Sequence, residues 1–340
     1  VLQSFIYFDI FCSNSIKKVL YSSTIKEASY LDNFNQEEKR VQYYSGGELT
    51  DKKPTDTETG AEVKTEVKAE VKEEAKKAPA KKATAKKAEK EVEVKEEDLL
   101  FDKTFICKAC DREFKSKMVR TGKVKLLEQD TDLRPKYQYV DSLKYDAVVC
   151  PYCGFAALNR FFNYLTDSQA KLIKTNISAK FKGLKEIEGS WTYDDAILRH
   201  KLVLINAIVK HAKSSEKAYI CLKLAWLCRG KSETLPEDTK DLATVKKTLA
   251  EQEKEYIANA YEGFQESFSK EPFPICGMDE NTLTYLVADL ARQLGKYDDA
   301  LRLVGRVITS RSANDRIKSK GIEMKEMIKK EKEKLEKMNN

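Results

Sequence analysis

Two pairs of cysteines are the residues of this sequence whose types and spacing most clearly indicate chemistry. Cys107 and Cys110 are separated by two residues, and so are Cys150 and Cys153, which Gly154 follows directly. A Cys-x-x-Cys turn directs both sulfurs to one side, so two such turns that face each other supply four thiolates at tetrahedral corners. Zinc prefers this ligand set. The spacing therefore predicts one structural zinc ion per chain, bound by all four cysteines.

Two other uses of the paired thiols stay open. A single Cys-x-x-Cys motif is enough for a redox dithiol, and neighbouring cysteines can form disulfides in an oxidising compartment. The apolar segment 1–11 lacks the basic region and cleavage site of a signal peptide. No stretch reaches the length of about 18 apolar residues that would suggest a membrane span. We therefore expect a protein of the reducing cytoplasm with no membrane contact.

The other titratable residues form no catalytic constellation. His200 and His211 have no nucleophile and carboxylate near them in sequence, and Asp130 and Asp132 lie in a Thr-, Arg- and Pro-rich segment that predicts a turn. Four thiolates would leave no open position on the metal, so we expect no enzymatic activity. An enzyme that uses the 130–134 loop is the least favoured hypothesis. Four further cysteines are expected to be structural or unpaired: Cys12, Cys221, Cys228 and Cys276.

Basic and aromatic residues suggest a second binding hypothesis. The segment between Phe114 and Leu127 carries five cations, and four tyrosines follow, in a combination that suits phosphate contact and base stacking. A net charge of +7, from 62 Lys and Arg against 55 Asp and Glu, is small for a dedicated nucleic-acid binder. The residues are Lys115, Lys117, Arg120, Lys123 and Lys125, with Tyr137, Tyr139, Tyr145 and Tyr152.

Short strands must position the cysteine pairs. Phe105 and Ile106 lead into the first pair, and segments 119–127 and 145–149 are rich in aliphatic, β-branched and aromatic residues, which predicts strands. Gly154 permits a left-handed backbone directly after the last cysteine. We expect a small β zinc ribbon over residues 99–156.

Helical periodicity begins after the ribbon. Capping boxes at Thr166 and Thr192 predict two helix starts, and further helices are expected from about Ser214 and over 239–268. Residues 157–312 would form an all-α domain. The charged segment 313–340 has sparse apolar positions, which predicts a solvated helical tail. The fold class expected for the whole is α+β.

The N-terminal quarter differs in composition. Residues 1–48 show no clear period, and a purine-rich run that resembles a bacterial ribosome-binding site could encode 45–48. Our hypothesis is that translation starts at Leu49 and that 1–48 are mis-annotated upstream sequence. Residues 49–98 are rich in Lys, Glu and Ala and have no aromatic residue, so we expect a disordered linker whose lysines could contact nucleic acid.

Segment 282–308 resembles a tetratricopeptide repeat. A small residue, Ala288, precedes the turn Gly295-Lys296-Tyr297, and a second small residue, Ala300, follows it. This resemblance implies stacked helices with a concave face that binds a protein or peptide.

Much of the chain resembles the bacterial family called domain of unknown function 2225. The resemblance covers roughly residues 101–310 and implies a zinc ribbon followed by tetratricopeptide-like helices, without implying an activity. Lys108 stands where that family often has proline, which does not disturb ligation. We expect a zinc-binding protein-interaction or scaffold module; the alternative is a nucleic-acid-associated regulator that uses the basic ribbon and the linker. The motifs that carry the resemblance are 105–110, 114–115, 131–132, 145–156, 224–227, 285–286 and 294–300.

Overall fold

The structure is a computed structural model that describes residues 94–184 and 187–339. The predictions about residues 1–48 and about most of the linker lie outside these ranges. The described chain begins before the expected ribbon boundary: Glu96–Leu99 form a 3-10 helix, η4. Leu99 is buried, and the Glu96 carboxylate accepts hydrogen bonds from Lys144 and Tyr145. The last residues of the predicted linker therefore pack on the ribbon.

Three separate antiparallel strand pairs form the β part of the described chain. The first pair keeps a continuous register from Leu100 opposite Val119 to Ile106 opposite Glu113. The second contains an irregularity between Leu126 and Glu128, and the third joins two three-residue strands. The pairs are β1 (Leu100–Ile106) with β2 (Glu113–Val119), β3 (Leu126–Gln129) with β4 (Pro135–Tyr137), and β5 (Ala147–Val149) with β6 (Ala156–Leu158).

The predicted strand over 119–127 is wrong. Strand β2 ends at Val119, and a 3-10 turn, η5 (Thr121–Lys123), precedes β3. The cause is local: Arg120 uses its backbone N–H to bond the Leu99 carbonyl and its side chain to bond the Leu100 carbonyl, which closes the ladder. The predicted strand at 145–149 is shorter than expected, because a second 3-10 turn, η6 (Ser142–Tyr145), occupies its start.

The helices follow the predicted starts closely. Thr166 and Thr192 each form a complete capping box, with Gln169 and Asp195 as their partners. The helices and the strand pairs together form the α+β fold that the sequence predicts. The helices are α3 (Asp167–Ile173), which continues into a π turn η7 (Lys174–Ser178), then α4 (Tyr193–Val209), α5 (Ser214–Thr234), α6 (Leu242–Lys270), α7 (Glu280–Gln293), α8 (Tyr297–Thr309) and α9 (Asp315–Asn339).

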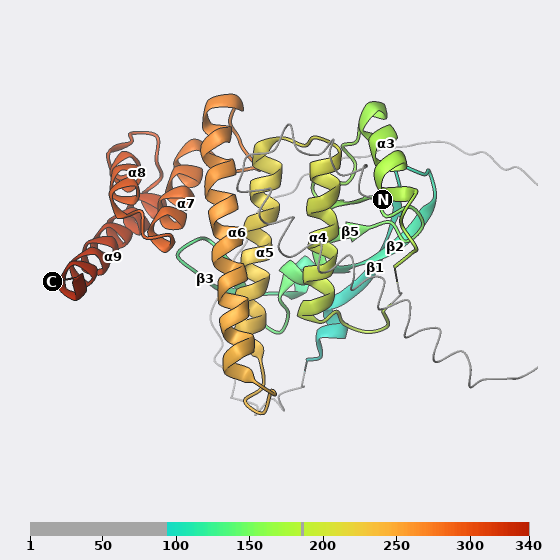
Figure 1. Cartoon of the computed structure of the whole chain (residues 1–340), viewed down its shortest axis with the longest axis horizontal. Helices are drawn as coiled ribbons and strands as arrows, with labels where there is room; N and C mark the ends of the chain where they lie inside the picture. The colour runs from blue at the N-terminus through green and yellow to red at the C-terminus, as the bar shows by residue number, and fades with distance from the viewer. Residues whose placement is uncertain (1–93, 185–186, 340) are drawn as a thin grey trace, which may run out of the picture. The chain divides into compact units, whose positions relative to one another are not determined.

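Helices α4, α5 and α6 lie side by side, with α4 next to strands β5 and β6 (Figure 1). Helix α5 is the central one, since it contacts both α4 and α6, and its residues 220–228 are all buried. Helices α7, α8 and α9 follow, with α8 packed on both of its neighbours.

Two helices depart from a simple division into one buried and one solvated face. In α4, the apolar residue Leu198 is 39% exposed. Helix α9 is not a solvated tail along its whole length, because Ile317, Met324 and Ile328 are buried and the helix contacts α7 and α8. Three apolar residues at seven- and four-residue spacing are enough to hold its first half against a neighbouring helix. In the part of the chain that the structure describes, no helix has the length and apolarity needed to cross a membrane.

Candidate metal centre

Two hairpin turns carry the four cysteines. The turn between β1 and β2 contains Cys107 and Cys110, and the turn between β5 and β6 contains Cys150 and Cys153. In both hairpins the last ladder pair lies next to the first cysteine: Ile106 opposite Glu113, and Val149 opposite Ala156. The strands therefore hold each turn by both of its ends.

The two turns use the same backbone hydrogen bonds. The N–H of Cys107 bonds the Arg112 carbonyl at 3.0 Å, and the N–H of Asp111 bonds the Cys107 carbonyl at 2.8 Å. The same positions of the second turn repeat this pattern, from Cys150 to the Phe155 carbonyl at 2.9 Å and from Gly154 to the Cys150 carbonyl at 3.1 Å. The two sites are thus built by one local fold, which the shared Cys-x-x-Cys spacing produces twice.

The residue after each second cysteine has a left-handed backbone. Asp111 has a φ of 59°, which aspartate tolerates, and Gly154 has a φ of 72°. Only the second position also demands glycine for space, because a Cβ there would lie 2.6 Å from ring carbons of Phe181. The Gly154 carbonyl accepts a hydrogen bond from the buried Asn206 amide of α4 at 3.1 Å. Helix α4 therefore fixes the second turn, through a contact that local sequence patterns do not predict.

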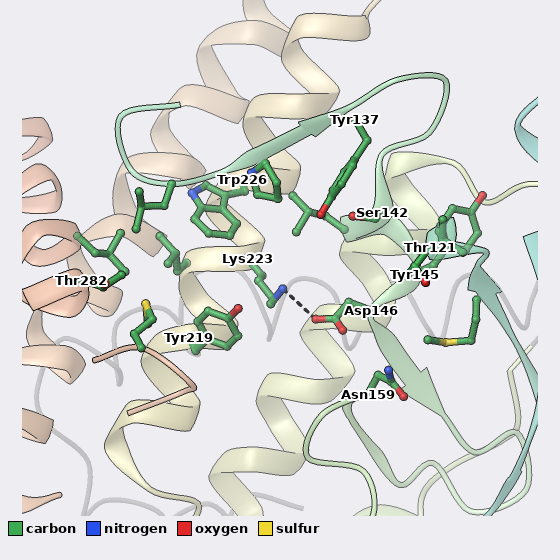
Figure 2. A pocket seen from close by; sticks show the side chains of 18 residues that line it. Thr121, Tyr137, Ser142, Tyr145, Asp146, Asn159, Tyr219, Lys223, Trp226 and Thr282 are labelled. Atoms are coloured by element: carbon green, nitrogen blue, oxygen red, sulfur yellow. Dashed lines mark ion pairs between the residues drawn. The ribbon is translucent and has the colours of Figure 1, made fainter. Parts of the chain in front are cut away.

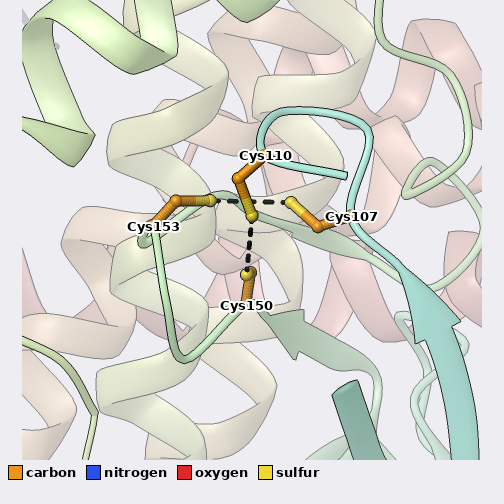
Figure 3. A group of neighbouring side chains, drawn as sticks. All are labelled: Cys107, Cys110, Cys150 and Cys153. Atoms are coloured by element: carbon orange, nitrogen blue, oxygen red, sulfur yellow. Dashed lines mark hydrogen bonds between the residues drawn. The ribbon is translucent and has the colours of Figure 1, made fainter. Parts of the chain in front are cut away.

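The four sulfur atoms converge on one point (Figure 3). All lie within 4.8 Å of one another, with Cys107 Sγ 3.5 Å from Cys153 Sγ and Cys110 Sγ 3.7 Å from Cys150 Sγ. A tetrahedron of sulfurs about 2.3 Å from a central ion has edges of about 3.8 Å. The cluster could therefore hold a metal ion. All four cysteines are free thiols, so no disulfide joins them.

The cluster is buried on an aromatic core. Cys107 and Cys150 have no exposed surface, Cys153 keeps 6%, and Cys110 is partly buried. Four phenylalanine rings pack against one another next to the turns, in stacked, tilted and edge-on pairs whose ring centroids are 5.1–5.8 Å apart. They are Phe105, Phe114, Phe155 and Phe162. This packing sets the two hairpins at the distance that brings their turns together.

The thiols polarise one another. A hydrogen bond from Cys107 lowers the pKa of Cys150 and raises that of Cys107 itself, and backbone N–H groups of Cys153 and Tyr152 add to the lowering at Cys150. The cysteines thus compete for protons, and metal binding would displace those that remain on the ligand sulfurs.

The predicted basic surface is only partly assembled. Lys115, Arg120, Lys123 and Lys125 are exposed and Lys117 is half-buried. Of the four tyrosines, Tyr139 and Tyr152 are exposed and Tyr137 is half-buried, but Tyr145 is 1% exposed. Its hydroxyl donates to Glu96 at 2.7 Å and accepts from the Trp191 N–H at 3.1 Å. Tyr145 is therefore a core residue and cannot stack on a base.

Asp130 and Asp132 lie in a turn, as predicted, with the N–H of Leu133 bonded to the Asp130 carbonyl. Their side chains bind Arg229 of α5: the guanidinium is 2.8 Å from Asp132, 3.1 Å from Asp130 and, on its other side, 2.7 Å from Glu253 of α6. Gln293 of α7 also donates to Asp132. The β3–β4 loop is thus an anchor between helices.

Neither histidine belongs to the cysteine cluster, and the two lie in different environments. His200 is buried, its Nδ1 lies 2.8 Å from the Ala196 carbonyl, and burial lowers its pKa to about 4. His211 is exposed just after α4. Cys221 and Cys228 are buried in α5, as expected for core thiols, and burial raises the pKa of both to about 12.

This fold and this cluster define an α+β protein whose paired β-hairpins present four cysteines able to hold a metal ion, next to a set of packed helices. A model of the family described as an uncharacterized protein conserved in bacteria, DUF2225, matches residues 100–335. The chain belongs to this bacterial family. The match extends beyond residue 310 into α9, which agrees with the packing of that helix on α7 and α8. No curated protein and no solved structure matched the chain.

Proposed function

We propose that the four cysteines hold one structural zinc ion and that the protein is a protein-interaction or scaffold module. The observation that carries the metal assignment is the convergence of four sulfurs from two identical turns. Thiolates in a tetrahedral set are the preferred ligands of zinc, and a set of four closes the coordination shell. The ion would join two hairpins, so its role is structural and we propose no enzymatic activity.

Packing of the last helices supports the interaction role. Ala288 of α7 and Ala300 of α8 have no exposed surface, and Gly295 turns between the two helices with a φ of 73°. These are the features on which the resemblance to a tetratricopeptide repeat rests. Repeats of this kind present helix faces to a peptide or a partner protein. Zinc thiolates require reduced cysteines, which supports a cytoplasmic location.

Metal content tests the first part. The purified full chain should contain about one zinc per chain, and Cys150→Ser should lose it, while the matched variant Cys276→Ser outside the cluster should keep it. Zinc that is absent from the wild-type chain, or that Cys150→Ser retains, would contradict the proposal and favour a redox reading of the thiols.

Capture of partners tests the second part. The tagged chain should retain a protein partner at high salt after nuclease treatment. A triple variant with Lys115, Lys123 and Lys125 changed to glutamate should retain the same partner. Binding of RNA or DNA that weakens steeply with salt and disappears in the triple variant would instead support the nucleic-acid alternative, which the exposed cations favour.

A further inference from the structure

A cavity separate from the cysteine cluster lies between helix α5, the β3–β4 hairpin and the start of α7 (Figure 2). Its volume is about 450 Å³, which is within the range of small-molecule sites in proteins. Aromatic and aliphatic side chains form most of its wall, among them Tyr137, Trp226 and Leu286. Such a wall suits the apolar body of a small organic molecule.

One face of α5 forms the floor of this cavity. Tyr219, Leu222, Lys223 and Trp226 all line it, and their spacing of three and four residues places them on the same side of the helix. Lys223 is 7% exposed and Trp226 is 5% exposed. A lysine on the buried face of a helix is uncommon and needs a partner.

That partner is Asp146, which follows η6. Lys223 Nζ lies 2.9 Å from Asp146 Oδ2 and 4.8 Å from the centre of the Tyr219 ring. Burial opposes ionisation of Asp146, but the Lys223 cation outweighs it and lowers the pKa of the carboxyl group. Both groups are therefore charged at neutral pH. Among the residues that line the cavity they are the two with a formal charge, so its net charge is zero.

The ion pair retains capacity for a ligand. An ammonium group has three donors, so the bonds of Lys223 to Asp146 and to the Tyr219 hydroxyl leave one donor, and the Asp146 carboxylate keeps accepting capacity at its two oxygens. The Asp146 side chain is 23% exposed and the Lys223 side chain 9%, so the pair is reachable from the cavity. A buried ion pair contributes little net stability compared with apolar residues of similar size. A binding role explains its place on an otherwise apolar helix face.

We propose that this cavity binds a hydrophobic α-amino acid. Its ammonium group would bind Asp146, its carboxylate would bind Lys223, and its side chain would lie against Trp226 and Tyr137. A zwitterion matches both members of the pair at once and leaves the net charge of the cavity unchanged. A ligand with only an anion would face the Asp146 carboxylate, and one with only a cation would face the Lys223 ammonium, so each would lose one attraction and gain one repulsion.

Titration with three probes tests this assignment on the full, metal-loaded chain. L-Phenylalanine carries both charges, whereas 3-phenylpropionate and phenethylamine each carry one on the same ring and chain. The chain has two tryptophans, so the two indole N–H signals of a ¹⁵N-labelled sample give a site-specific readout. L-Phenylalanine should shift the Trp226 signal with half-saturation below about 1 mM. The singly charged probes, 3-phenylpropionate and phenethylamine, should each bind at least about tenfold more weakly than L-phenylalanine.

A double variant separates the ion pair from the cavity. Asp146→Asn with Lys223→Met removes both charges together and leaves no unpaired ion in the core. It should bind L-phenylalanine at least about tenfold more weakly while its melting temperature stays near that of the wild type. The matched control is Asp194→Asn with Lys231→Met, which removes an ion pair of α5 outside the cavity and should leave binding unchanged.

Three outcomes would overturn the assignment. The first is the absence of a saturable shift with L-phenylalanine, and the second is an affinity for 3-phenylpropionate or phenethylamine equal to that for L-phenylalanine. The third is an unchanged affinity for L-phenylalanine in the folded Asp146/Lys223 double variant. Because the zinc content of each sample is measured beforehand, failure of this inference can be told apart from failure of the metal assignment.

Discussion

At the scale of single residues, position 154 shows how one backbone conformation supports the cysteine cluster. Gly154 combines a left-handed φ with a Cβ position that the Phe181 ring would occupy. We predict that Gly154→Ala lowers the free energy of unfolding by about 2 kcal/mol or more and weakens zinc retention.

The first turn offers the matched control. Asp111→Gly affects the corresponding position, where aspartate already adopts a φ of 59°. Its free energy of unfolding should stay within about 0.5 kcal/mol of the wild type in chemical denaturation. Equal effects of the two substitutions would show that the Phe181 contact and the backbone strain at position 154 are unimportant.

A second residue-scale prediction concerns His200, which faces Asp146, Lys223 and Arg199 and has a pKa lowered to about 4, mainly by burial. Between this value and about 6.5, the unfolded chain binds a proton that the folded chain does not. Stability from His200 is thus fully present above about pH 6.5 and falls as the pH drops towards 4. The loss between pH 7 and pH 5 should be about 2 kcal/mol.

Urea denaturation at pH 7 and pH 5 of the wild type and His200→Gln measures this contribution. The variant should lose less stability than the wild type over the same interval, because glutamine does not titrate. The cysteine cluster is common to both proteins, so its own acid sensitivity cancels in the comparison. Equal losses in the two proteins would contradict the prediction.

At the scale of elements, Arg229 joins the β3–β4 loop to two helices. Its guanidinium compensates Asp132, which has no exposed surface, and also binds Asp130 and Glu253. Arg229→Met would leave the Asp132 charge buried without that cation. We predict a loss of about 3–5 kcal/mol in the free energy of unfolding, because an uncompensated buried charge is severely unfavourable.

The matched control for this prediction is Lys270→Met. Lys270 pairs with Glu266 on the surface of α6, with 64% and 47% of the two side chains exposed. Its loss should change stability by less than about 1 kcal/mol, as for other exposed pairs. If urea denaturation gives similar losses in the free energy of unfolding for both variants, the ion pairs of Arg229 contribute no more to stability than an exposed pair does.

At the scale of the whole molecule, the two cysteine hairpins differ in how they are attached. Strands β5 and β6 contact α4, and the turn between them is bonded to Asn206. The β1–β2 hairpin meets the rest through η6, through the rings of Phe105 and Phe114 against Phe162, and through the cysteine cluster. Loss of a metal ion would therefore affect the first hairpin most.

Hydrogen exchange with and without a chelator tests this difference. Metal removal should abolish the protection of residues 100–119 and leave that of α5 and α6 nearly unchanged, because the helices bury their own core. Binding free energies of structural zinc sites are on the order of 10 kcal/mol, so the loss should be complete at moderate temperature. Uniform loss across the helices would show that the ribbon and the helices fold as one cooperative unit.

Features with short-range causes could be predicted from the sequence. The two Cys-x-x-Cys turns, the left-handed Gly154, the helix starts at Thr166 and Thr192 and the 130–135 turn each depend on residues within a few positions of one another. Spacing of this kind determines which way a side chain or a backbone amide points. It was therefore sufficient to place the candidate metal ligands and to identify the family.

Only the tertiary structure decided the contacts between distant segments. Arg229 binds Asp132, 97 positions away, and Lys223 pairs with Asp146 of a separate element in the wall of the cavity. The end of β2 at Val119 depends on bonds from Arg120 to Leu99 and Leu100. Such contacts follow from how whole elements pack, and local spacing carries no information about which charged residue of one element will face another. The sequence alone thus determined the two cysteine turns, while packing determined how they converge, the ionic anchor, the cavity and the buried face of α9.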